Sequence, residues 1–351
     1  MRWFAVFALA ACGGGHGKPD GAVAGDVAAD TPRDSTPDAD PNNPLTLYDT
    51  GLCADQACTQ IAAGISTYTP AYGLWSDAAS KRRWILLPAG SQIDTTDPDH
   101  WEFPVGTKLW KEFTSQDAAN NPVRVETRFI WRQAMGTAND WFYVAYEWNS
   151  AQTETMAVPA GDPNANGTQH DIPARFQCKQ CHEGISSRVL GFGAIQLDHL
   201  PASGDIAIDD LVSGGKLTTN PPGANAPHYK LPGTGSSTAA IGYLHANCGH
   251  CHNPQSQVYQ SENVNMELRL TVASLGALST TPVYMTAIDH DATFPIDSLT
   301  KRIVTDMPDQ SILIDRFEAT PTDAKHMPLI GSEVMDRTAD ITLRDWILHI
   351  Q

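Results

Sequence analysis

The chain has 351 residues, of which 41% are hydrophobic, and its formal net charge at pH 7 is −17. This apolar fraction is enough to build globular cores, whereas the negative charge argues against nucleic acid as a partner, because phosphate binding requires an excess of Lys and Arg. The charge favours basic or neutral protein partners, or solubility alone.

The N-terminus has the features of an export signal. Arg2 supplies a positive charge, and residues 3–11 form an apolar stretch that is too short to span a bilayer. The stretch ends in Leu9-Ala10-Ala11-Cys12, which resembles a bacterial lipobox. We expect residues 1–11 to be removed as a lipoprotein signal peptide and Cys12 to carry lipid, the alternative being an ordinary signal peptide with a chance cysteine. Such a protein would be held at the periplasmic face or the outer membrane of a Gram-negative bacterium.

Residues 12–44 are expected to form a mobile tether. They are mostly Gly, Ala, Asp and Pro, with six aspartates against only Lys18 and Arg33. Such a segment buries too little apolar surface to offset its ordering entropy. No later stretch is long and apolar enough for a transmembrane helix. The remaining residues, about 307, are enough for two domains of ordinary size.

Residues 45–158 predict a β-rich domain. Apolar or alternating runs, separated by Gly and Pro, occupy residues 83–87, 108–113, 123–131 and 141–148. A period of two with turn residues between the runs is typical of a sandwich or a barrel, and we expect a sandwich-like domain. Its dense aromatic side chains are expected to fill a core.

Residues 159–351 predict a region of loops and short helices, which opens with a linker over residues 159–176. Residues 239–246 have helical spacing, and residues 338–350 predict an amphipathic closing helix. The expected apolar face of that helix consists of Leu343, Trp346, Ile347 and Ile350. The expected fold class is therefore α+β.

Six cysteines follow Cys12, and two of them lie close together. Cys53 and Cys58 are five residues apart, and disulfides form in an oxidising compartment outside the cytoplasm. We expect a local disulfide between them. Free thiols or a distant pairing are the alternatives.

The other four cysteines form two copies of one motif. Cys178-Lys179-Gln180-Cys181-His182 and Cys248-Gly249-His250-Cys251-His252 both read C-x-x-C-H, which is the attachment motif of c-type haem. Two thiols at this spacing reach the two vinyl groups of one porphyrin, and the following histidine ligates the iron. The two copies predict two covalent haems, with His182 and His252 as proximal ligands.

Two rival interpretations of the motifs are weaker. Two C-x-x-C pairs can hold zinc, but zinc ribbons usually space their pairs by about 15–20 residues, much less than the gap here. Zinc also does not require a histidine directly after each pair. A redox C-x-x-C would need a thioredoxin-like βαβ setting, which the sequence does not indicate.

A six-coordinate haem needs a second axial ligand. Met327-Pro328 resembles the Met-Pro loop of small cytochromes c, so we assign Met327 to the second haem. Met307 is the next choice and Met335 is weaker, and each could instead be an ordinary buried methionine. The candidates for the first haem are His199, His245, His170, Met266 and Met285. His245 could serve if the two haems are near each other, and an iron without a protein ligand would open a catalytic role.

From about residue 45 onward the chain resembles an exported, mostly uncharacterised family of bacterial dihaem c-type cytochromes. The stretches that carry the resemblance are residues 72–77, 81–84, 103–107, 125–128, 190–192, 243–252 and 327–329. The resemblance implies electron transfer by two haems beside a β-rich domain, and it implies no substrate. One departure is Thr305-Asp306-Met307-Pro308, where relatives tend to read Pro-Gly-Asp-Pro.

The leading hypothesis is a membrane-anchored electron-transfer lipoprotein that serves redox partner proteins. A dihaem peroxidase or oxidase with one open iron is the alternative. A third hypothesis gives the β-rich domain a docking role for the redox partner.

Overall fold

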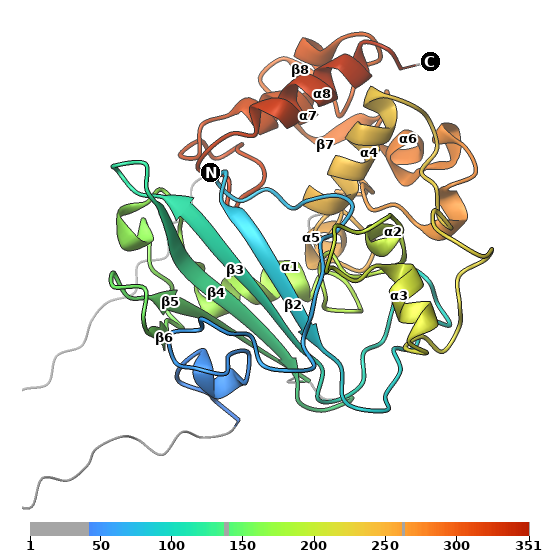
Figure 1. The fold of residues 1–351 in the computed structure, drawn as a ribbon. Helices are drawn as coiled ribbons and strands as arrows, with labels where there is room; N and C mark the ends of the chain where they lie inside the picture. The colour runs from blue at the N-terminus through green and yellow to red at the C-terminus, as the bar shows by residue number, and fades with distance from the viewer. Residues whose placement is uncertain (1–41, 137–139, 262–263, 351) are drawn as a thin grey trace, which may run out of the picture. The chain divides into compact units, whose positions relative to one another are not determined.

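The computed structural model describes residues 42–136, 140–261 and 264–350, and all of them belong to one compact unit. The predicted signal peptide, the lipidation site Cys12 and nearly all of the predicted tether lie outside these ranges. The earlier part of the described chain forms a β-sheet, and the later part contributes most of the helices (Figure 1). The predicted α+β class is confirmed.

All four predicted strand runs overlap strands of one antiparallel sheet, in which each strand pairs with its neighbours in sequence. The strands are β1 (Ser66–Thr67), β2 (Ser80–Leu86), β3 (Lys108–Gln116), β4 (Pro122–Arg132), β5 (Trp141–Trp148) and β6 (Thr155–Ala157). The expected second sheet of a sandwich is not seen in the described ranges. There, the remaining strands β7 (Asp291–Ile296) and β8 (Leu299–Lys301) form a separate hairpin. Loops and helices cover the two faces of the six-stranded sheet instead.

One face of the sheet carries a row of aromatic side chains. Trp84, Trp110 and Phe129 lie directly opposite one another on β2, β3 and β4, and each is at most 2% exposed. Leu47 and Leu52, from the segment before the sheet, pack against this row. Burying a side chain of this size stabilises the fold by roughly 1.5–3 kcal/mol, so the preceding segment is an integral layer of the fold.

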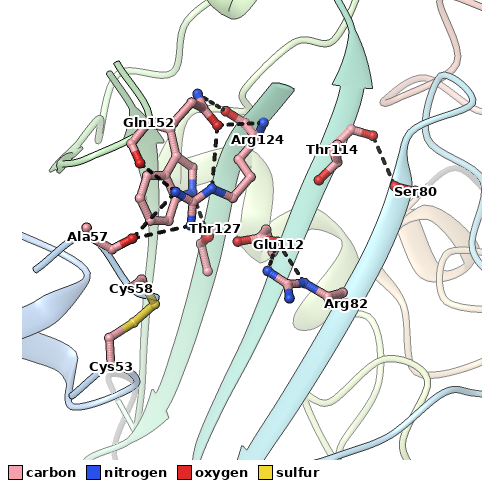
Figure 2. A network of polar contacts seen from close by, with 11 residues as sticks. Cys53, Ala57, Cys58, Ser80, Arg82, Glu112, Thr114, Arg124, Thr127 and Gln152 are labelled. Atoms are coloured by element: carbon pink, nitrogen blue, oxygen red, sulfur yellow. Dashed lines mark hydrogen bonds and ion pairs between the residues drawn. A yellow bond between two sulfur atoms is a disulfide. The ribbon is translucent and has the colours of Figure 1, made fainter. Parts of the chain in front are cut away.

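A disulfide joins Cys53 to Cys58 in this covering segment, with 4.9 Å between the Cα atoms. Arg124 of β4 holds the loop in place: its guanidinium stacks 3.5 Å from the ring centre of Trp148 and donates to the Ala57 carbonyl at 3.5 Å (Figure 2). The disulfide therefore cross-links the segment that covers the aromatic face of the sheet.

The opposite face of the sheet shares its core with the region after residue 158. Ile85, Leu109, Ile130 and Tyr143 lie in register across β2–β5 and pack in one cluster with Phe192. The same cluster includes Val189, Leu197, Ile208 and Leu211. The sheet is thus a wall of the region that carries the two C-x-x-C-H motifs.

Helices are short and frequent after the sheet. The α-helices are α1 (Arg175–His182), α2 (Ala194–Leu197), α3 (Ile208–Ser213), α4 (Ser236–Asn247), α5 (Gln257–Ser261), α6 (Pro282–Thr286), α7 (Ile312–Glu318) and α8 (Arg337–Ile347). The 3-10 helices are η1 (Tyr48–Thr50), η2 (Ala165–Gly167), η3 (Val272–Ser274), η4 (Leu278–Thr280) and η5 (Pro308–Gln310).

The two predicted helices are both present. α4 covers the predicted residues 239–246 and begins three residues earlier, and α8 covers most of the predicted closing helix. Leu343, Trp346 and Ile347 of α8 are at most 1% exposed and pack with α4, against which α8 lies (Figure 1). The amphipathic spacing placed these side chains correctly because a period of 3.6 puts them on one face.

The predicted linker is a packed segment. Ala165 and Ile172 are at most 3% exposed and cluster with Val125 and Ala145 of the sheet. The Asp162 and Ile172 backbones also exchange two hydrogen bonds, at 3.0 and 2.8 Å. Its Gly, Pro and Asn residues make tight turns here, so the composition that suggested a free linker describes a folded loop.

Candidate haem-binding site

The first motif lies on α1. Cys178 and Cys181 are almost one helical turn apart, and His182 is the last residue of the helix. Both thiols are free and half-buried, and Cys178 packs against the core that the sheet shares with the later region. Burial raises the pKa of Cys178 above its ordinary value.

His182 is held in an orientation suited to a metal ligand. Its Nδ1 lies 2.6 Å from the Arg188 carbonyl oxygen, which can only accept, so Nδ1 carries the proton and Nε2 keeps its lone pair. Burial lowers the pKa of His182 to about 4, so the ring is neutral near pH 7. A hydrogen bond from the second ring nitrogen to a carbonyl is the usual support of a metal-bound histidine.

The second motif directly follows α4. Cys248 closes the helix through a hydrogen bond from its N–H to the Leu244 carbonyl, at 2.9 Å. The His252 N–H bonds to the Cys248 carbonyl at 2.9 Å, which turns the histidine back toward its own cysteines. Burial lowers the pKa of His252 to about 4, and its buried Nδ1 has no hydrogen-bond partner among the described residues. This imidazole, too, is neutral near pH 7.

The fold brings the two motifs side by side although they are 70 residues apart. One ligand atom from each of Cys181, His250 and Cys251 lies within 4.8 Å of the others. The Asn253 amide donates to the carbonyls of Gly184 and His250, at 3.0 Å each, and so ties the two segments together. A Cβ at position 184 would lie 2.2 Å from the His250 carbonyl oxygen, so only glycine allows this approach.

The first cysteines of the two motifs pack in different hydrophobic clusters. Cys178 packs in the cluster under the sheet, whereas Cys248 packs in the cluster between α4 and α8. The second cysteines of the motifs meet at the junction, where a hydrogen bond from Cys251 lowers the pKa of Cys181 to about 4. The site therefore consists of two half-sites, one for each motif, which meet at Cys181 and Cys251.

This donor set fits the group that C-x-x-C-H implies. Each half-site offers two free thiols at the required spacing, followed by a buried neutral imidazole. Thioether formation needs unpaired cysteines, and iron ligation needs an unprotonated ring nitrogen.

Two of the predicted distal ligands are histidines that already make contacts through their ring nitrogens. Both ring nitrogens of His199 lie near carbonyl oxygens, those of Leu200 and Thr69, at 3.1 and 2.8 Å. The His170 Nε2 lies 2.7 Å from the Glu126 carboxylate, and both side chains are at most 1% exposed. Coordination by His199 would therefore require breaking a hydrogen bond, whereas the buried Nδ1 of His170 has no hydrogen-bond partner among the described residues.

The remaining candidates for the first haem differ in their surroundings. Met285 is 62% exposed, and Met266 packs against the cluster between α4 and α8. His245 is buried on α4, its Nδ1 accepts from the Leu270 N–H at 3.0 Å, and burial lowers its pKa to about 3. Its Nε2 makes no hydrogen bond within the described ranges, and the side chain lines a hollow with a cavity volume of about 60 Å³. Of the five, His245 is the one that lines this hollow, and we take it as the leading candidate.

The loop that carries Met327 is fastened to α7. The Met327 N–H donates to the Arg316 carbonyl at 3.0 Å. Burial, then His250 and then the guanidinium of the same Arg316 lower the pKa of His252. Met327 is half-buried, whereas Met307 is 54% exposed. Met335 is half-buried in the same loop region. The surroundings favour Met327 over Met307 as a ligand near the second motif.

Sequence reasoning missed the cations of the hollow that His245 lines. Arg83 of β2, Lys111 of β3 and Arg269 all line it, and Asp99 is the one carboxylate among its described lining residues. Strand alternation could have shown that Arg83 and Lys111 share a face, but the pairing register that sets them side by side is a tertiary property.

Within the described part of the chain, no helix is long and apolar enough to cross a membrane. The sequence matches no family model, and comparisons with curated proteins and with solved structures find no match.

Proposed function

We propose that this protein is an electron-transfer c-type cytochrome with two covalently attached haems. The observation that carries the proposal is the meeting of two C-x-x-C-H motifs, 70 residues apart, at one junction. Each motif there offers two free thiols and a buried neutral histidine. A buried histidine whose Nδ1 bonds to a carbonyl, as in His182, is oriented for iron rather than for proton transfer at the surface.

We assign the following roles to the residues of the two motifs. Cys178 and Cys181 would anchor the first haem and Cys248 and Cys251 the second, with His182 and His252 as proximal ligands. Haem iron supplies a one-electron ferric–ferrous couple. The Arg188 carbonyl holds the His182 ring in one tautomer and one orientation, and the surrounding cores exclude water.

The geometry of the junction supports exchange between the two cofactors. The sulfurs of Cys181 and Cys251 belong to different motifs and lie within 4.8 Å, so the two haems would be attached at neighbouring points. The first cysteines lead into different cores, so each cofactor would be enclosed by its own set of apolar side chains. A protein built in this way can receive an electron at one cofactor and release it at the other.

We assign His245 as the distal ligand of the first haem and Met327 as that of the second. Bis-His ligation usually gives a lower reduction potential than His/Met ligation, so the two haems should titrate separately. Lipid on Cys12 would hold the protein at the periplasmic face or the outer membrane. Its net charge of −17 suits a basic redox partner protein.

The first experiment counts haems on protein matured with a cytochrome c assembly system. We expect a pyridine haemochrome spectrum and an intact mass that report two haems, and one haem in each of the variants Cys178→Ala/Cys181→Ala and Cys248→Ala/Cys251→Ala. Wild-type protein without covalent haem would overturn the proposal.

Carbon monoxide then separates a carrier from a catalyst. If both irons have a protein ligand on each side, the reduced spectrum should not change with carbon monoxide, whereas His245→Ala should create one carbon monoxide-sensitive haem. A wild-type protein with one high-spin, carbon monoxide-binding haem would favour the dihaem peroxidase or oxidase instead.

One further candidate has an observation in its favour, namely a metal ion held by Cys181, His250 and Cys251. These three side chains are close enough for a common ion, and the contact with Cys251 lowers the pKa of the Cys181 thiol. Metal analysis distinguishes the two functions. A metal site predicts one zinc per chain that is lost in His250→Ala, whereas the haem proposal predicts that this variant keeps both haems.

A further inference from the structure

We propose that Arg83 and Lys111, on the inner face of the sheet, form a seat for the propionate carboxylates of the first haem. This inference rests on the proposed function and gives the β-sheet a specific role in it. The ligand chemistry is a pair of carboxylates beside a buried porphyrin edge.

The two cations are neighbours in the sheet. Arg83 of β2 is paired with Lys111 of β3, and Lys111 is paired with Arg128 of β4, so three cationic side chains form a row across the strands. Like charges directly opposite one another are destabilising in a sheet. A row of this kind therefore needs a compensating anion.

Among the described residues only Arg128 of this row makes an ion pair, whereas Asp205 acts on Arg83 and Glu126 acts on Lys111 without one. Arg128 donates from Nε to the Glu126 carboxylate at 2.9 Å. Arg83 is 8% exposed and Lys111 is half-buried, and neither makes an ion pair with any described residue. The Lys111 ammonium lies 4.8 Å from the centre of the Phe113 ring. A buried charge without a partner is costly, so these two positions call for an anion from outside the polypeptide.

The two unpaired cations face the hollow that His245 also lines. The segment that follows His182 forms another wall of this hollow, through residues 187 and 189–196. The same face of the sheet carries Tyr143, whose ring centre lies 5.4 Å from that of His182. The hollow therefore lies between the segment after the first motif and His250 of the second motif, and it is lined by His245, which we assign as the distal ligand of the first haem.

The charge of the hollow suits a dianion. Arg269 also lines it, and the Asp99 carboxylate, which accepts from the Val272 N–H at 2.8 Å, offsets the charge of Arg269. A haem carries two propionates, and guanidinium and ammonium groups are the side chains that bind carboxylates through charge-assisted hydrogen bonds. Two free cations on one wall match two carboxylates of one cofactor.

The test uses holoprotein with both haems attached and measures the two midpoint potentials by spectroelectrochemical titration. Removing a cation beside a haem makes its surroundings more negative and stabilises the ferric state. We therefore expect Arg83→Met and Lys111→Met each to lower one of the two potentials, with the other unchanged. The expected size is at least a tenfold shift in the ferric–ferrous equilibrium, about 59 mV for one electron.

Lys108→Met is the matched control. Lys108 lies on β3 three residues before Lys111, but it faces the other side of the sheet, where its ammonium donates to the Thr50 carbonyl at 2.7 Å. We expect this variant to leave both potentials unchanged. Arg83→Lys, which keeps the charge, should stay close to the wild-type potential, and it also reports on the seat if Arg83→Met loses haem.

Each result has a definite meaning. Unshifted potentials in both Met variants, with two haems per chain, would overturn the seat and leave the proposed function standing. A wild-type potential that changes when acetate is added would assign the seat to a free carboxylate and overturn the propionate assignment. Wild-type protein without covalent haem would overturn both proposals.

Discussion

At the scale of single residues, the junction of the two motifs depends on a close backbone contact that leaves no room for a side chain. Gly184 lies against the His250 backbone, and a Cβ there would be 2.2 Å from the carbonyl oxygen. We expect Gly184→Ala to lower the free energy of unfolding by about 1–3 kcal/mol, the usual cost of overpacking. Gly193→Ala, where a Cβ meets nothing within 4 Å, should change it by less than about 0.5 kcal/mol. Urea denaturation of the two variants checks this, and equal losses would contradict it.

A second prediction at this scale concerns the buried carboxylate of Glu126. Burial by itself would raise its pKa, but the Arg128 guanidinium and the His170 hydrogen bond hold the pKa below the ordinary 4.5. A depressed folded-state pKa gives stability that is present above pH 4.5 and is lost as the pH falls through the lower, folded-state value. Wild-type stability should therefore decline in this acid range, and Glu126→Gln should flatten that part of the decline.

The same variant should cost stability near pH 7. Glu126→Gln leaves the partly buried Arg128 without its counter-charge, and breaking a buried ion pair costs about 3–5 kcal/mol. Thermal unfolding between pH 3 and pH 7 measures both effects. An acid decline as steep in the variant as in the wild type would assign this part of the acid sensitivity to another carboxylate.

At the scale of elements, α8 positions the second motif through α4. Leu343 is fully buried against α4, whose last residue precedes Cys248, whereas Ile341 on the same helix is 68% exposed. We expect Leu343→Ala to lower the free energy of unfolding by about 2–5 kcal/mol and to reduce attachment of the second haem. Ile341→Ala should have little effect on either. Attachment is measured by intact mass, and loss of the first haem instead would contradict the coupling of α8 to the second motif.

At the scale of the whole molecule, the sheet and the motif region share one core. Phe192 lies 4.8 Å from Tyr68 and 5.8 Å from Phe103, ring centre to ring centre, so the two regions bury each other's side chains. We expect residues 45–158 and 159–351 to unfold together. Far-ultraviolet circular dichroism, near-ultraviolet circular dichroism and haem absorbance should give coincident denaturation curves. Two separated transitions would show that these ranges are independently stable domains.

Local patterns predicted the elements well because they depend on neighbouring residues. The alternating runs at 108–113 and 123–131 and the aromatic run at 141–148 are strands, and the spacing of Leu343, Trp346 and Ile347 is that of a buried helix face. Their partners could not be predicted in this way. The sandwich was expected because alternation shows that a strand has a buried face, but it does not show whether a second sheet or a layer of helices and loops covers that face.

The sequence by itself determined the chemistry: the C-x-x-C-H spacing, the histidine beside each pair and the charge pattern are covalent facts of the chain. Only the tertiary structure decided which groups meet. It set Cys181 beside Cys251 and Arg83 beside Lys111. It also engaged both ring nitrogens of His199, while Nε2 of His245 makes no hydrogen bond to any described residue. The physical reason is that a residue type fixes what a side chain can donate, accept or ligate. Contacts between residues far apart in the sequence depend on how all the elements pack together, and no local pattern contains that information.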